Sequence, residues 1–199
     1  MKQAIAYLTL SLIIATNIAA QEGYRCGDLL FCPQQKSDME KAIGSSTGEY
    51  THVAIVEVDS TSRVWIIEAS GGKGVRRIPY SEWNHRNISV YRLNVPFDTA
   101  AVIARAKSFI GQPYDNSFLP DNGKMYCSEL VYEAFLDADG KHLFNSQPMN
   151  FRDKSGKMPK YWKKHFQVGH RHTRRRRGHQ SDRSVQITTA DKSFVGTRA

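Results

Sequence analysis

The sequence lacks the features of a disulfide-stapled, cofactor-binding or membrane-spanning protein. Its 199 residues include only three cysteines, too few for a disulfide framework. It has no CxxC pair, no glycine-rich phosphate loop and no GxSxG elbow. Beyond the N-terminal segment, no apolar run approaches the roughly 20 residues that a membrane span needs. We therefore expect no metal, no cofactor and no transmembrane segment in the mature chain.

Acidic residues are scarce only at the C-terminal end. The formal net charge is +9, but residues 167–199 alone hold eight basic and two acidic residues, among them Arg174–Arg177. Residues 21–166 are nearly neutral, with 19 basic and 17 acidic side chains. Because the charge belongs to the tail, we expect no specific nucleic-acid binding by the folded part.

The two ends of the chain differ in character from its middle. Lys2, the apolar stretch Ala4–Ala15 and the small pair Ala19–Ala20 are typical of an export signal, here residues 1–20. The alternative is an uncleaved N-terminal anchor. We expect export to the periplasm or the extracellular space. Residues 21–168 are the predicted folded domain, and residues 169–199 a basic disordered tail that contacts anionic surfaces or, alternatively, has no role.

The middle of the chain has strands first and its main helices later, which indicates an α+β fold. The expected strands are Gly27–Phe31, Thr51–Val58, Arg63–Ala69 and Asn87–Leu93. Helices are expected after the Ser37 capping box as far as Gly44, from the Asp98 cap to Ile110, and from Cys127 to near Gly140.

Cys127 is the first candidate for chemistry. It stands where a glycine-bearing loop meets the start of an amphipathic helix. The partial positive charge and free N–H groups of a helix N-terminus stabilise a thiolate, the nucleophilic form of cysteine. Burial of Cys127 as a core residue is an equally weighted alternative on spacing alone.

His52 is the best-placed base, and Glu68 is the candidate that orients it. Both lie in β-rich runs joined by a short loop, and a buried carboxylate needs a partner. If the loop has an odd number of residues, such as Asp59–Thr61, His52 and Glu68 face each other on one side of the sheet. The alternatives are a core histidine and a solvent-facing carboxylate.

The remaining cysteines and histidines have weaker signals. If Gly27–Phe31 is extended, Cys26 and Cys32 lie roughly 20 Å apart, too far for a disulfide. His85 is in a polar stretch and is expected at the surface. His142 follows the end of a helix and is expected to cap it.

Five blocks of sequence together resemble a known family. They are GDLLF (27–31), YTHVAIV (50–56), WIIEA (65–69), GQPYD (111–115) and YCSELVY (126–132). In order and spacing they are similar to the permuted papain-like amidases, the YaeF/YiiX group of the NlpC-type cysteine peptidase superfamily. The resemblance implies a circularly permuted papain-like α+β fold, with an antiparallel sheet packed against the helix of the nucleophile.

The resemblance places the family's nucleophile on Cys127, its base on His52 and its third polar residue on Glu68. Tyr114, in the PYD block, is expected to line the substrate site. The implied activity is that of a secreted cysteine hydrolase that cleaves an amide bond, with cell-wall peptides or acylated amines as candidate substrates.

Two other functions remain open. One is a lipid-directed thioesterase or acyltransferase with the same triad, and the other is a non-catalytic binding module. A long apolar groove beside Cys127 would favour acyl chains, whereas a short polar one would favour peptides.

Overall fold

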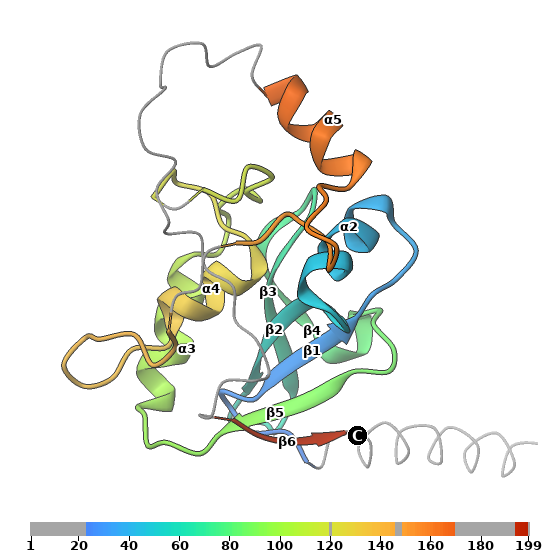
Figure 1. Cartoon of the computed structure of the whole chain (residues 1–199). Coiled ribbons are helices and arrows are strands. Elements are labelled where there is room, and N and C mark those ends of the chain that lie inside the picture. Colours follow the sequence, from blue (N-terminus) through green and yellow to red (C-terminus); the bar gives the residue numbers. More distant parts are fainter. Residues whose placement is uncertain (1–22, 120, 146–148, 170–193, 199) are drawn as a thin grey trace, which may run out of the picture.

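A six-stranded antiparallel sheet forms the centre of the protein (Figure 1). The computed structural model describes residues 23–119, 121–145, 149–169 and 194–198. The strands are β1 (Leu29–Pro33), β2 (Tyr50–Val58), β3 (Val64–Ser70), β4 (Gly74–Pro79), β5 (Ser89–Leu93) and β6 (Phe194–Arg198). They are ordered β4-β3-β2-β1-β5-β6, and every neighbouring pair is antiparallel. The predicted α+β class with an antiparallel sheet is confirmed.

Alternation along the strands gives the sheet two apolar faces. Val53 and Ile55 point to the face covered by α3 (Thr99–Ser108) and α4 (Cys127–Ala134), where the largest buried cluster lies. Ala54 and Val56 point to the other face, which Trp83 covers from the segment after the short 3₁₀ helix η1 (Tyr80–Glu82). Each fully buried aliphatic side chain contributes about 1.5–3 kcal/mol, so both faces hold the sheet in place.

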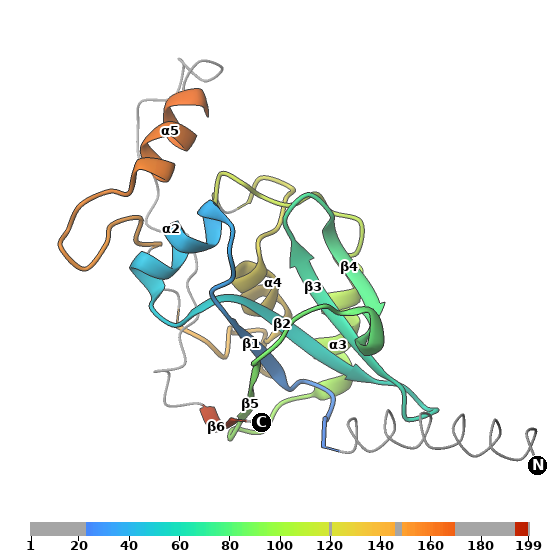
Figure 2. The ribbon, with the colours of Figure 1, turned by 90° about the vertical axis from the view of Figure 1, so that its right-hand side faces the viewer.

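A third apolar cluster joins two helices beyond one end of the sheet. Helix α2 (Asp38–Thr47) begins with the predicted capping box between Ser37 and Glu40. Trp162 of α5 (Lys160–Gly169) is buried and its indole N–H donates to the carbonyl of Ala42 on α2, at 3.3 Å. Figure 2 shows α5 above α2 and away from the sheet. The side chains of this cluster therefore enclose space beyond the end of the sheet.

Strand β4 was not predicted, because its charged residues hide the apolar pattern. Arg76 pairs with Glu68, and Arg77 pairs with Glu57. Successive side chains of a strand point to opposite faces, so the two pairs lie on opposite sides of the sheet. An arginine that meets a buried carboxylate on another strand can occupy a position that alternation would assign to an apolar residue.

Other boundaries also differ from expectation. Helix α2 continues past Gly44 to Thr47, and α4 ends at Ala134 rather than near Gly140. The structure pairs β6 with β5, whereas we expected disorder throughout residues 169–199. The predicted signal segment 1–20 and the arginine run of the tail lie outside the described residues. In the part that the structure describes, no helix has the length and apolarity to cross a bilayer.

Candidate active site

A β-bulge immediately precedes His52. Cys32 of β1 pairs with His52 and Pro33 pairs with Tyr50, which leaves Thr51 as an extra residue in β2. Bulges bend a strand and redirect its side chains, and they are common beside active sites. The bulge therefore places Tyr50, Thr51 and His52 around the end of the sheet where α4 begins.

His52 and Glu68 are in direct contact, with Nε2 of the imidazole 2.7 Å from Oε2 of the carboxylate. The loop between their strands has five residues, because Val58 lies opposite Val64. This odd number meets the condition for the pairing of His52 with Glu68, and the register differs by two residues from the example of an Asp59–Thr61 loop. Glu68 therefore lies across from Ala54, and it reaches His52 diagonally on the same face.

Glu68 is fully buried and surrounded by donors. The Arg76 guanidinium donates to Oε1 from Nε at 2.9 Å and from Nη2 at 2.5 Å, and the Trp83 indole N–H donates to Oε2 at 2.9 Å. Burial alone would raise the pKa of Glu68, but His52, Trp83 and Arg76 outweigh it and lower the pKa to about 2. Glu68 is thus a carboxylate at any physiological pH.

Cys127 is the first residue of α4, and its thiol interacts with the imidazole of His52. Burial opposes its ionisation. The hydrogen bond and charge of His52, together with backbone N–H groups of Val53 and Ser128, overcome that opposition and lower the pKa of the Cys127 thiol. These are the surroundings in which a cysteine becomes a thiolate at neutral pH.

His52 carries the complementary charge. Burial by itself would lower its pKa, but its bonds and charge interactions with Cys127 and Glu68 raise the pKa to about 10. Glu68 binds Nε2, which leaves Nδ1 as the ring nitrogen for the sulfur of Cys127. These shifts favour a thiolate on Cys127 beside a protonated His52, with the Glu68 carboxylate on the other side of the ring.

His85, which we expected at the surface, is partly buried against this site. The His85 ring stacks on that of His52, with the centroids 5.3 Å apart and an angle of 16° between the planes. Its centroid lies 4.6 Å from that of the Trp83 ring. Gln35 Nε2 lies 3.0 Å from its Nδ1. Burial first and the charge of His52 second lower the pKa of His85, so a neutral ring lies against the charged one. In the sequence, only the aromatic Trp83 two positions earlier indicated that this segment packs against the sheet.

The potential ligand atoms of His52, Glu68 and His85 lie within 4.8 Å of one another. Their arrangement does not fit a metal ion well. Both Glu68 oxygens already accept hydrogen bonds, and the Arg76 cation lies against one of them. One nitrogen of each imidazole is also already engaged, Nε2 of His52 by Glu68 and Nδ1 of His85 by Gln35.

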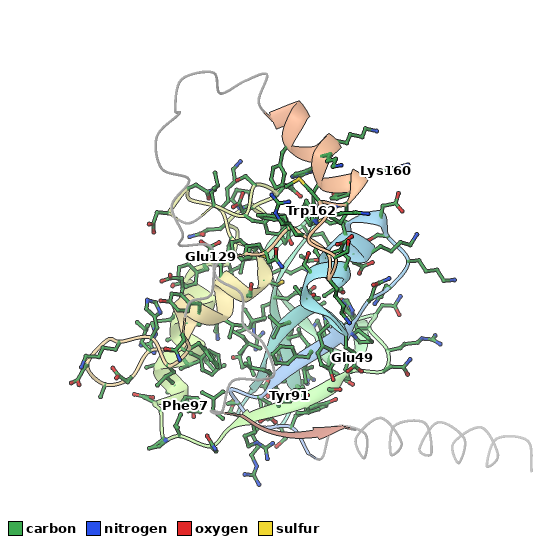
Figure 3. The ribbon with its side chains drawn as sticks, in the orientation of Figure 1. Glu49, Tyr91, Phe97, Glu129, Lys160 and Trp162 are labelled. Carbon is green, nitrogen blue, oxygen red and sulfur yellow. The ribbon has the colours of Figure 1, made fainter. Side chains whose placement is uncertain are left out.

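A pocket opens beside His52 and Cys127. Its walls come from β1, β2, α2, the start of α4, two loops and α5, and Trp162 lies at the end of α5 near α2 (Figure 3). The lining is mostly apolar and aromatic: Phe31, Ile43, Thr47, Tyr50, Thr51, His52, Val53, Tyr114, Phe118, Tyr126, Cys127, Ser128, Met149, Asn150, Phe151 and Trp162. Tyr114 therefore lies where a substrate would contact it.

Backbone pairing brings the GQPYD segment to the site. Asp115 N–H donates to the Met125 carbonyl, and Met125 N–H donates to that of Pro113, both at 3.0 Å. The buried Asp115 carboxylate accepts from the N–H groups of Ser117 and Leu119, at 2.8 and 2.6 Å. This turn presents Phe118 to the pocket, a function of Asp115 that the sequence did not reveal.

Glu129 is a second buried carboxyl close to Cys127. Its Oε2 accepts from the Tyr126 N–H at 3.3 Å, closing the first turn of α4. Burial, followed by the nearby acidic groups, raises its pKa to about 8. Glu129 is therefore largely neutral at pH 7, and it places no full negative charge beside the thiolate.

We expect Glu129→Gln to stabilise the protein by roughly 3 kcal/mol more at pH 8 than at pH 5. The unfolded carboxyl ionises above its usual value of 4.5, whereas the folded one stays protonated up to about 8. Folding stability therefore decreases between these pH values, and glutamine, which mimics the protonated acid, avoids the decrease. Urea unfolding of both proteins at the two pH values tests this, and an equal difference at both would contradict it.

Neither of the other cysteines contacts Cys127 in a disulfide, although Cys32 lies across from His52 on β1. The Cys26 sulfur is bonded to the backbone of Val58, at 3.0 Å from its nitrogen, and Cys32 is buried in the sheet without a disulfide. His142 Nδ1 lies 2.9 Å from the Tyr132 carbonyl in the last turn of α4, as expected for a capping residue.

Comparisons with known proteins agree with this architecture. The family model described as permuted papain-like amidase enzyme, YaeF/YiiX, C92 family, matches residues 23–189. YiiX, an uncharacterised protein of Escherichia coli (strain K12), is 27% identical over 156 residues, which cover 74% of this chain and 75% of YiiX. The crystal structure of metalloprotein YiiX from Escherichia coli O157:H7 aligns with a TM-score of 0.54 at 26% identity, over 62% of this chain and 71% of that one.

Proposed function

Because this chain belongs to the permuted papain-like amidase family YaeF/YiiX, we propose that it is a cysteine hydrolase that cleaves amide bonds by acyl transfer. The observation that carries the proposal is the row of Cys127, His52 and Glu68 beside a pocket. A binding module would have no need for a buried thiolate held by a buried ion pair, which is costly to maintain.

In the first half of the reaction the Cys127 thiolate attacks the carbonyl carbon. The carbonyl oxygen becomes an oxyanion, to which the backbone N–H of Cys127 donates. As the carbon–nitrogen bond breaks, protonated His52 gives its Nδ1 proton to the leaving amine, and the acyl group stays on sulfur as a thioester.

In the second half, neutral His52 takes a proton from water, and the resulting hydroxide equivalent attacks the thioester. The carboxylic acid leaves, and the thiolate and imidazolium are restored. Glu68 takes no proton in this cycle. It binds Nε2–H, orients the ring and stabilises its positive charge.

Acyl-enzyme capture tests the proposal. After brief exposure to p-nitrophenyl acetate, intact-mass analysis should show one added acetyl group, located on Cys127. Formation of this adduct should slow by roughly 10²-fold or more in His52→Ala. EDTA should leave its rate unchanged, because no metal takes part. Absence of a Cys127 adduct would favour the binding-module alternative, and loss on chelation would favour a metal-assisted reaction.

The place of action remains part of the proposal. The signal pattern in residues 1–20 supports export to the periplasm or beyond, and the basic tail supports contact with anionic surfaces there. Cleavage after Ala20, read from the N-terminus of the exported protein, is the expected processing.

A further inference from the structure

The pocket beside Cys127 has a chemical character that narrows the substrate class. We propose that it binds an apolar acyl chain, so that the substrates are amines acylated with an aliphatic or aromatic acid rather than charged peptides. This inference rests on the proposed hydrolase function and adds to it the identity of the acyl half.

The walls of the pocket favour apolar ligands. Ring contacts hold them together: Phe118 meets Tyr126 at 5.4 Å and Trp162 at 5.5 Å, and Phe151 meets Trp162 at 5.0 Å between centroids. Among the described residues that line it, none is Asp, Glu, Lys or Arg. Away from His52 and Cys127 themselves, a charged substrate group would lose its hydration without gaining an ionic partner, which is strongly unfavourable.

One polar atom in the wall has no partner. The Thr51 side chain is buried, with only 7% of the residue exposed, and its Oγ1 forms no hydrogen bond with any described residue. Thr51 is the bulged residue that precedes His52 and lines the pocket. A buried hydroxyl is normally hydrogen-bonded, so the polar end of a ligand is the natural partner here. An acyl chain ending in an amide supplies one polar group at the reacting end and none beyond it.

The order of the reaction assigns the pocket to the acyl half of the substrate. The acyl group stays on Cys127 through two steps, whereas the amine must leave and water must enter between them. An apolar pocket next to the sulfur holds a chain well through both steps and offers little to a departing amine or to water.

The test compares acyl p-nitroanilides that differ only in the acyl group. We expect kcat/KM for the octanoyl compound to exceed that for the acetyl compound by about 100-fold, since each buried methylene adds to binding. Suberic acid mono-p-nitroanilide, which has the same chain length but ends in a carboxylate, should react at least about 10-fold more slowly than the octanoyl compound.

Ile43→Trp fills the pocket and should reduce the ratio of octanoyl to acetyl activity by about 10-fold. Ile110→Trp is the matched control, because Ile110 is 43% exposed and does not line the pocket. It should leave the ratio as in the native protein.

The Thr51→Val variant tests whether the Thr51 hydroxyl binds substrate or only supports the fold. Loss of an unpaired buried hydroxyl should raise the melting temperature, while loss of a ligand bond should raise KM for the octanoyl compound about 5-fold or more. If Thr51 serves structure alone, the melting temperature falls and KM stays unchanged.

Two failures are distinguishable. If Cys127 forms an adduct with p-nitrophenyl acetate but octanoyl and suberyl compounds react equally, the apolar-chain proposal is wrong and the hydrolase stands. If no adduct forms with any compound, the hydrolase proposal itself is wrong.

Discussion

Replacing Cys127 with serine is expected to lower kcat/KM for any amide substrate by roughly 10³-fold or more. In the proposed mechanism Cys127 is a thiolate beside protonated His52, in line with the lowered pKa of the thiol, so the nucleophile is ionised before substrate arrives. A serine hydroxyl, whose pKa is far higher, would stay protonated, and His52 in its charged form could not accept the proton. The side chains are similar in size, so folding should be nearly unaffected.

Cys26→Ser is the matched control. Cys26 lies in the turn before β1, where its sulfur is bonded to backbone groups of Val58 that a hydroxyl can also bind. The activity of the Cys26→Ser variant should equal that of the native protein. Steady-state rates with octanoyl p-nitroanilide and circular dichroism of both variants make the comparison. Comparable losses in both would show that Cys127 is not the nucleophile.

Glu68→Gln is expected to have the second largest effect, because it removes the charge on which two cations depend. Arg76 and protonated His52 would face a neutral amide in a buried place. We expect about 3–5 kcal/mol of lost stability and roughly 10²- to 10⁴-fold lower kcat/KM. Without the carboxylate the pKa of His52 falls, and the thiolate loses its stabilising charge.

Glu57→Gln distinguishes this role from that of an ordinary ion pair. Glu57 is also buried on the neighbouring strand and pairs with Arg77 and Lys107, but it touches no group of the site. The Glu57→Gln variant should be less stable than the native protein but equally active per folded molecule. Denaturant titrations with activity assays measure both quantities. If Glu68→Gln were as active as Glu57→Gln, Glu68 would be a structural residue only.

The stability of the protein in acid should depend on the ionisation of Glu68. Its pKa is lowered from 4.5 to about 2, so its contribution to stability is complete above pH 4.5 and is lost as the pH falls toward 2. Native protein should therefore lose its stability advantage over Glu68→Gln across this pH window.

The central sheet and the reactive groups could be predicted from the sequence because they depend on local periodicity. Alternation in residues 51–58 places His52 and Ala54 on one face, and an odd loop is enough to place Glu68 on that face as well. The 3.6-residue period after Cys127 predicts the helix, and its first position predicts the environment of the sulfur.

What could not be predicted depends on contacts between distant segments. Arg76, Trp83 and His85 complete the site from β4 and the segment that follows it, and nothing local in that polar stretch indicates that it folds over the sheet. The bulge at Thr51 depends on the pairing of β1 with β2, which periodicity within β2 does not contain. The pocket likewise needs α5, whose Trp162 is 120 residues away from its partner Ala42.

The most direct measurement of the thiolate–imidazolium pair is the pH dependence of Cys127 alkylation. The protein carries Cys26→Ser and Cys32→Ala, so iodoacetamide has one thiol to react with. We expect rapid alkylation with an apparent pKa well below the free-cysteine value of about 8.5, and loss of that advantage when His52 is replaced with alanine. A slow thiol with an ordinary or raised pKa, unchanged by His52→Ala, would contradict the account and make Cys127 a packing residue.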